Sequence, residues 1–123
     1  MGLPLLDESK LQQLLDLDEG NTLLLGEMAA LFKAETPRRL AAIRTGLETG
    51  NASVVMEAAH ALKGASGLMG AQIVFALARE LEMKAKAGDL PSGEVAFEAW
   101  TRLDEAVLKA QEAIDYFLSK ITP

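Results

Sequence analysis

"SGEVAFEAWTRLDEAVLKAQEAIDYF", residues 92 to 117, shows a regular repeat of apolar side chains. The repeat alternates spacings of three and four through almost the whole stretch, at Ala96, Trp100, Leu103, Val107, Ala110, Ile114 and Phe117. This spacing places the apolar side chains on one face of a helix. Serine is a residue type that caps helix N-termini, so Ser92 predicts where the helix begins. The apolar face of such a helix must be covered by other elements.

Helices are expected upstream of residue 92 as well, because helix formers dominate and the alternating β-branched residues of strands are missing. The expected spans are about residues 7–17, 22–50, 51–67 and 71–87. Asn21 or Thr22 can cap the second of these helices, Gly50 ends it, and Asn51 starts the third. The apolar residues expected on the second helix are Leu24, Met28, Leu31, Phe32, Leu40, Ile43 and Leu47.

The four longer helices are joined by loops of a few residues, which favours antiparallel neighbours. We therefore predict an all-α fold, an antiparallel up-down-up-down four-helix bundle with an additional short N-terminal helix that packs across one end. Residues 1–123 are expected to form a single domain, since the chain is long enough for one core but not two.

Composition narrows the function classes. Eighteen acidic and twelve basic residues give a formal net charge of -6, which repels nucleic-acid phosphates and anionic membrane surfaces. No apolar run approaches the ~20 residues of a membrane span, and no signal peptide is evident. The chain has no cysteine, which excludes disulfides, iron–sulfur clusters and thiol catalysis. We expect a cytoplasmic monomer that binds neither nucleic acid nor membrane.

The only histidine, His60, falls on the outer face of the third predicted helix. At about 100° per residue, the apolar residues gather within roughly 60° of the opposite side. This expected core stripe consists of Val54, Val55, Ala58, Leu62, Ala65 and Met69. Gly67 can simply end the helix, but Gly64 lies inside it, where glycine costs about 1 kcal/mol relative to alanine. Bare backbone at Gly64 would let another macromolecule approach the imidazole closely.

The residue types around the histidine suit phosphoryl transfer. An imidazole is largely neutral and nucleophilic at pH 7, and Lys63, one turn away, can neutralise an arriving anion. On the fourth helix, a stripe at spacings of four, three and four consists of Phe75, Arg79, Glu82 and Lys86. If this stripe borders the third helix, Glu82 can accept a hydrogen bond from one ring nitrogen and leave the other for attack. Lys86 would add positive charge.

The segment "AHALKGASGLMGA", residues 59 to 71, closely resembles the signature of histidine-containing phosphotransfer (HPt) domains. The matching positions are His60, Leu62, Lys63, Gly64, Ser66, Gly70 and Ala71. The resemblance extends over roughly residues 7 to 118, and "LARELEMKAKAGDL" is similar to the family's fourth helix. It implies a four-helix bundle with an exposed phospho-accepting histidine midway along one helix.

The resemblance also implies roles for individual residues. His60 would be phosphorylated on the ring nitrogen remote from the backbone, Lys63 would stabilise the phosphoryl group, and Gly64 would give the partner clearance. The expected supporting residues are Glu82, Lys86, Arg79, Ser66 and Gly67. Many family members carry glutamine at the position of Glu82. A carboxylate can fill the same acceptor role, provided that Lys86 or Arg79 offsets its charge.

The function expected from this resemblance is that of a phosphorelay intermediate, a phosphoryl carrier between receiver-domain aspartates. The partners would be response-regulator receiver domains and a hybrid histidine kinase, and Met56 and Phe75 are the expected contacts. Mg²⁺ would belong to the receiver, and this chain would bind no cofactor. It has no Gly-rich phosphate loop, so no ATP-dependent kinase activity is expected.

The residues alone leave other functions open. A non-transferring adaptor of the same fold would bind receivers or kinases through the same surface. Glu57 and His60 form a Glu-x-x-His pair, as in di-iron bundles, but such sites need a second pair facing the interior. The chain can also be a domain of a larger hybrid kinase.

Overall fold

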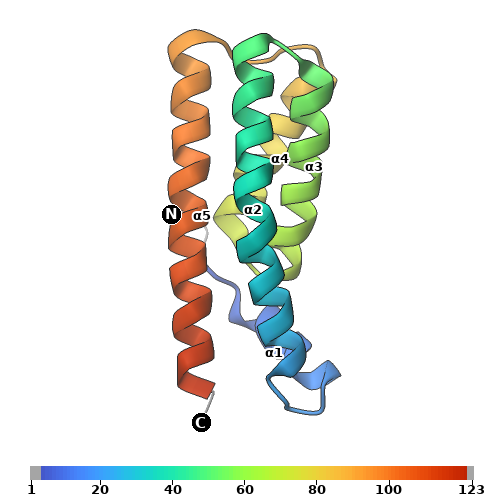
Figure 1. Cartoon of the computed structure of the whole chain (residues 1–123), viewed down its shortest axis with the longest axis vertical. Helices are drawn as coiled ribbons and strands as arrows, with labels where there is room; N and C mark the ends of the chain where they lie inside the picture. The colour runs from blue at the N-terminus through green and yellow to red at the C-terminus, as the bar shows by residue number, and fades with distance from the viewer. Residues whose placement is uncertain (1–3, 122–123) are drawn as a thin grey trace.

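A computed structural model describes residues 4–121, and over that range it contains helices and no strand (Figure 1). The helices are α1 (Glu8–Leu17), α2 (Leu23–Thr49), α3 (Ala52–Leu68), α4 (Gln72–Lys86) and α5 (Gly93–Ile121). The predicted all-α class is confirmed, and the boundaries lie close to the expected ones. Within the described range, none of these helices is both long and apolar enough to cross a membrane.

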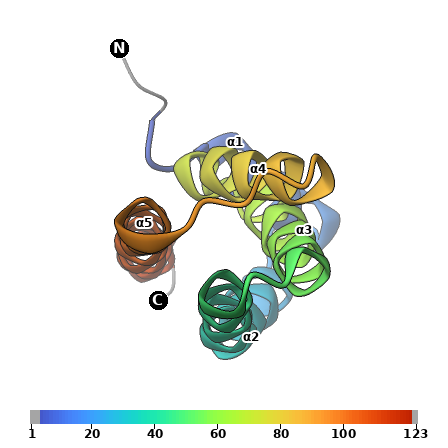
Figure 2. The same cartoon turned by 90° about the horizontal axis from the view of Figure 1, so that it is seen from above.

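The four longer helices surround a common interior in chain order (Figure 2). In Figure 1 the chain rises along α2, descends along α3, rises along α4 and descends along α5. α3 packs most extensively against α4, and α2 packs against both α3 and α5. In Figure 2, α5 is seen along its axis and α4 from the side, so the two helices are inclined to each other. α4 packs more extensively against α3 than against α5.

Cap residues explain where the helices begin and end. The carboxylate of Asp7 accepts a hydrogen bond from the main-chain nitrogen of Ser9 at 3.1 Å and starts α1. Gly50 ends α2 in the left-handed conformation, with φ 68°, which glycine adopts without steric cost. The side chain of Asn51 then accepts from the nitrogen of Val54 at 3.2 Å and starts α3, as the sequence predicts.

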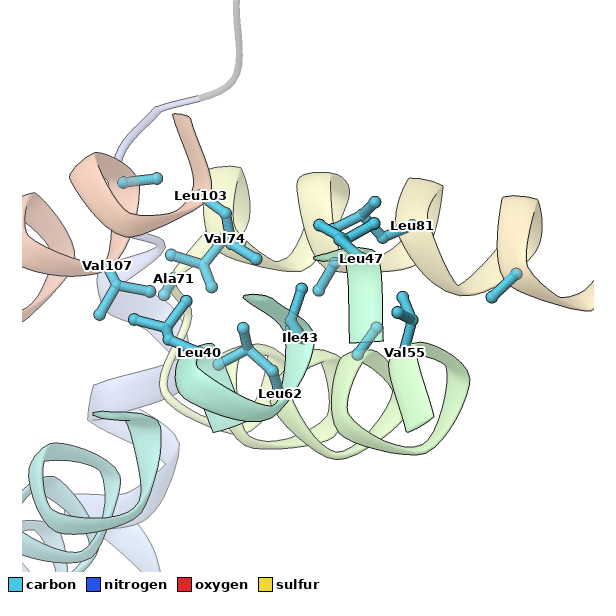
Figure 3. Close-up of a cluster of buried hydrophobic side chains, with 14 of the residues drawn as sticks. Leu40, Ile43, Leu47, Val55, Leu62, Ala71, Val74, Leu81, Leu103 and Val107 are labelled. Carbon is cyan, nitrogen blue, oxygen red and sulfur yellow. The ribbon is translucent and has the colours of Figure 1, made fainter. Parts of the chain in front are cut away.

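The main core lies between α2, α3, α4 and α5 (Figure 3). Ile43 from α2, Leu62 from α3 and Leu103 from α5 are fully buried members of it. The repeat predicted for α5 is buried along its length except at Trp100, which is half-buried. Its indole nitrogen donates a hydrogen bond to the carbonyl oxygen of Leu40 at 2.8 Å, which ties α5 to α2.

A second core lies at the end of the bundle where α1 packs. Its buried residues are Leu11, Leu14, Leu15, Leu25, Ala29, Phe32, Met69, Ile114 and Phe117. The prediction that the short first helix covers one end is therefore confirmed (Figure 1). The nitrogen of Asp7 donates to the carbonyl oxygen of Gly70 at 2.7 Å, so α1 is joined to the turn between α3 and α4. Gly70 has φ 73°, and a β-carbon there would collide with the Asp7 oxygen.

At the start of α2, not all of the apolar residues expected on this helix are buried. Leu31 is 53% exposed, and Leu24 and Met28 are half-buried. Leu25 and Ala29 are buried in their place. The reason is that the second core, formed with α1 and α5, lies one residue further round α2 than the extrapolated stripe.

Candidate functional site

His60 lies midway along α3 on its outer face, and 67% of its side chain is exposed. Gly64 is one turn further along. A β-carbon added at Gly64 would meet no heavy atom within 4 Å, so the space beside the imidazole is open. The outward orientation of His60 agrees with the helical periodicity.

Glu82 on α4 approaches His60 from below the surface and is only 3% exposed. One carboxylate oxygen, Oε2, lies 2.5 Å from His60 Nδ1. The other, Oε1, accepts from the ammonium of Lys63 at 2.6 Å. Lys86, one turn along α4, places its ammonium 3.7 Å from Oε2. A single buried carboxylate thus joins the imidazole to two lysines from two helices.

These partners keep Glu82 ionised. The hydrogen bond from Lys63 is the largest cause that lowers the pKa of Glu82, to about 2. The hydrogen bond with His60 and the charges of Lys63 and Lys86 act in the same direction, while burial opposes them. An ionised carboxylate has no proton to donate, so His60 Nδ1 must donate the hydrogen bond. Nε2 therefore carries the free lone pair of the neutral ring.

Small residues bring α3 and α4 close enough for this contact. Ala59 and Ser66 on α3 are fully buried, and Ala78 and Ala85, on either side of Glu82, are buried on α4. The buried stripe of α3 is therefore rotated from the expected one. Three residues expected in the core are only half-buried, namely Val54, Ala58 and Ala65. The rotation towards α4 places Glu82 beneath the His60 ring.

The same rotation buries Ser66, one of the expected supporting residues. Its side chain is fully buried, and its hydroxyl donates to the carbonyl oxygens of Leu62 at 2.8 Å and Lys63 at 3.0 Å. Ser66 consequently packs within α3 and does not reach the surface around His60. A small residue is needed there because α4 lies against it.

Gly67 does not end α3, which continues to Leu68. A β-carbon at Gly67 would lie 3.2 Å from the ring carbon Cδ2 of Phe75. Gly67 therefore makes room for the half-buried Phe75 ring on α4.

The geometry changes one further expectation on the site, the role of Arg79 in offsetting the charge of Glu82. Arg79 is exposed and forms no ion pair with Glu82 among the described residues. It lines a shallow groove with Phe75 and Met83. Lys63 and Lys86 offset the negative charge of the Glu82 carboxylate instead. Met56 is half-buried and packs partly against the main core.

Residues 27–113 match the family model of the Hpt domain. The chain belongs to the Hpt domain family. The match includes all of α3 and α4 and most of α2 and α5, while α1 lies outside it. No curated protein sequence matches this chain significantly.

The fold of this Hpt domain is similar to the crystal structure of histidine-containing phosphotransfer protein B (HptB) from Pseudomonas aeruginosa PAO1. The TM-score is 0.81 at 23% sequence identity, over 97% of this chain and 98% of that chain. The similarity therefore covers α1 as well as the part matched by the family model.

The Hpt domain also has an apolar groove between α2 and α3 that the sequence did not indicate. Its lining includes Leu31, Ala65 and Leu68, and the two leucines are 53% and 45% exposed. Leu68 lies one turn beyond Gly64 on α3. The signal in the sequence was that the second helix carries more apolar residues than one face can hold, since Leu31 and Phe32 are adjacent. No cluster of three or more potential metal ligands occurs in residues 4–121.

Proposed function

We propose that His60 accepts a phosphoryl group on Nε2 and passes it on, so that this Hpt domain acts as a phosphorelay intermediate. One observation carries the proposal. The exposed imidazole donates its Nδ1 proton to a buried, ionised carboxylate, which leaves the Nε2 lone pair directed away from Glu82. An imidazole fixed in this tautomer is a ready nucleophile.

The chemistry is reversible exchange between two acceptors. The Nε2 lone pair attacks the phosphorus of an aspartyl phosphate on a receiver domain, the P–O bond to the aspartate breaks, and the aspartate leaves as a carboxylate. The reverse step transfers the phosphoryl group to the aspartate of another receiver. The receiver supplies the aspartate and Mg²⁺, while this chain supplies the positioned ring. We expect no cofactor on this chain and no ATP-dependent kinase activity.

Lys63 and Lys86 provide the positive charge that the incoming phosphoryl group needs. Both ammonium groups lie on the carboxylate beneath the ring, at 2.6 and 3.7 Å. They compensate the negative charge of Glu82, which would otherwise repel a phosphoryl group. Arg79 forms no ion pair with Glu82 among the described residues, and we assign it to the surrounding surface.

The partner surface proposed for a receiver extends from His60 across Gly64. The proposed surface includes the open space at Gly64 and the groove with the exposed Leu31 and Leu68. It also includes Phe75 and the exposed part of Met56. This surface is formed by α2, α3 and α4. We take these helices to be part of an antiparallel up-down-up-down four-helix bundle, and the protein to be monomeric and cytoplasmic.

Transfer from a phosphorylated receiver tests the proposal. The wild type and His60→Gln are each incubated with the receiver and Mg²⁺, and the phosphate gained is tested for acid lability and alkali stability. We expect labelling of the wild type only. If receivers bind both proteins but label neither, the chain is a non-transferring adaptor. Labelling of His60→Gln would place the acceptor on another residue.

A further inference from the structure

We propose that Glu82 keeps phosphorylated His60 a labile phosphoryl donor, by holding the Nδ1 proton on the ring while the phosphoryl group is attached to Nε2. The inference rests on the proposed function and deepens it. It assigns Glu82 a positioning role in the release of the phosphoryl group as well as in its acceptance.

The carboxylate of Glu82 binds two different partners with its two oxygens. Oε1 is occupied by Lys63 at 2.6 Å, and Oε2 lies 2.5 Å from Nδ1 of His60. The ring and the lysine therefore do not compete for one oxygen. Because the side chain of Glu82 is 3% exposed, water has little access to replace either partner. The carboxylate can remain on Nδ1 when Nε2 changes its substituent.

The proton on Nδ1 decides how well the ring leaves. Attack by Nε2 forms the N–P bond and makes the ring an imidazolium cation that still carries its Nδ1 proton. When the N–P bond breaks, its electron pair returns to Nε2 and the ring leaves as neutral imidazole. If the Nδ1 proton is lost first, the ring must leave as an imidazolate anion, which is a far poorer leaving group. A negative charge at Nδ1 favours the protonated ring.

An uncharged amide at this position would act differently. The oxygen of glutamine can accept the same hydrogen bond, but it carries no charge to balance the imidazolium. Glu82 forms an ion pair with that cation at the moment when the ring is phosphorylated. The isosteric change Glu82→Gln therefore separates the effect of charge from the effect of hydrogen-bond geometry.

Charged side chains on or beside the His60 face come from three helices. They are Glu35 and Arg39 on α2, Glu57 and Lys63 on α3, and Arg79, Glu82 and Lys86 on α4. Of these charged side chains, Glu82 alone forms a hydrogen bond or ion pair with the ring among the described residues. Lys86 is 3.7 Å from the same oxygen, and its charge opposes protonation of the ring. Removal of Lys86 should consequently act in the opposite direction to Glu82→Gln.

The test labels the protein with phosphoramidate, a small phosphoryl donor, so that no receiver is needed. The loss of phosphohistidine is followed by ³¹P NMR across a pH series for the wild type and Glu82→Gln. Loss slows as the ring loses its Nδ1 proton, so each profile has a midpoint. We expect the midpoint of Glu82→Gln to lie about one pH unit lower, with about tenfold slower loss above both midpoints. Lys86→Gln should shift it slightly upward.

Glu80→Gln is the matched control, because Glu80 lies on α4 with its side chain 61% exposed and pairs with Lys84 instead. Its profile should coincide with that of the wild type. If the profile of Glu82→Gln also coincides with the wild type, the inference is overturned while the proposed function stands. If the wild type gains no more phosphate than His60→Gln, the proposed function fails with it. Circular dichroism of each variant verifies the fold.

Discussion

Glu80 and Glu82 are the same residue type on the same helix, yet they lie in opposite surroundings. The side chain of Glu80 is 61% exposed and pairs with Lys84 at 3.4 Å. Glu82 is 3% exposed and contacts His60 and Lys63 at 2.5 and 2.6 Å. The first is a surface ion pair of the kind that contributes little to stability. The second lies where α3 and α4 pack closely, so its charge acts on a functional ring.

Removal of the two carboxylates in turn gives the largest contrast. Glu82→Ala deprives Nδ1 of the acceptor that fixes its tautomer, so the rate of phosphoryl transfer from a receiver should fall about 10- to 100-fold, as for other partners that orient a histidine ring. Glu80→Ala should leave the rate unchanged. Initial rates with a phosphorylated receiver measure both. Equal losses in the two variants would show that the burial of Glu82 has no functional meaning.

The titration of Glu82 tests whether Lys63 is responsible for the difference between Glu82 and Glu80. Because the hydrogen bond from Lys63 is the largest cause of the lowered pKa, Lys63→Met should raise the pKa of Glu82 clearly above about 2. Burial raises this pKa, and in the variant fewer contacts remain that lower it. Carboxyl ¹³C NMR follows the titration. Lys84→Met, which removes the partner of Glu80, should leave the pKa of Glu82 where it is.

The lowered pKa of Glu82 also predicts a pH dependence of stability. Its pKa is about 2 in the folded protein against an ordinary 4.5, so the folded state favours the ionised form. The stabilisation is fully present above about pH 4.5 and is lost as the pH falls through about 2. Urea unfolding of the wild type should show this decrease in the free energy of unfolding at low pH. Glu82→Gln should lack the part of the decrease that comes from the protonation of Glu82. If the free energy of unfolding of Glu82→Gln depends on pH as steeply as that of Glu80→Gln and of the wild type, the pH dependence does not come from Glu82.

The smallest expected effect separates the two glycines of α3. Gly64→Ala should raise the free energy of unfolding by about 0.5–1 kcal/mol, because alanine favours the helix and its methyl group meets nothing. Gly67→Ala should lack this gain, since its methyl group would lie 3.2 Å from the Phe75 ring. Only Gly64→Ala places a new group in the open approach, so it should slow transfer while stabilising the fold. Urea unfolding and transfer rates test both variants.

Periodicity in the sequence predicted most of the fold because each helix buries one face. The repeat from Ala96 to Phe117, the caps at Asn51 and Gly50, and the outward orientation of His60 are all local properties of the chain. Leu31, one of the apolar residues expected on the second helix, is 53% exposed. Which of two adjacent lines of leucines on α2 is buried depends on where α1 and α5 pack, and local spacing does not contain that information.

The candidate site was predictable in its members but less so in its connections. The hydrogen bond between Glu82 and one ring nitrogen was expected if α4 bordered α3. That Lys63 pairs with the same carboxylate, and that Ser66 is buried, depends on how far α3 rotates towards α4. Arg79 and Lys86 looked equivalent as sources of charge on a helical wheel. In the structure, the ammonium of Lys86 lies 3.7 Å from Glu82 Oε2, whereas no ion pair joins Arg79 to Glu82 among the described residues.

The central claim is that the exposed Nε2 of His60 is the atom that carries the phosphoryl group. Its most direct test is ¹H–¹⁵N–³¹P NMR of protein labelled with ¹⁵N-histidine and phosphorylated by a receiver domain. Since the chain has a single histidine, the spectrum reports His60 alone. We predict coupling of phosphorus to Nε2, with a proton on Nδ1 hydrogen-bonded to Glu82. Coupling to Nδ1, or protein-bound phosphate without coupling to either ring nitrogen, would contradict the account.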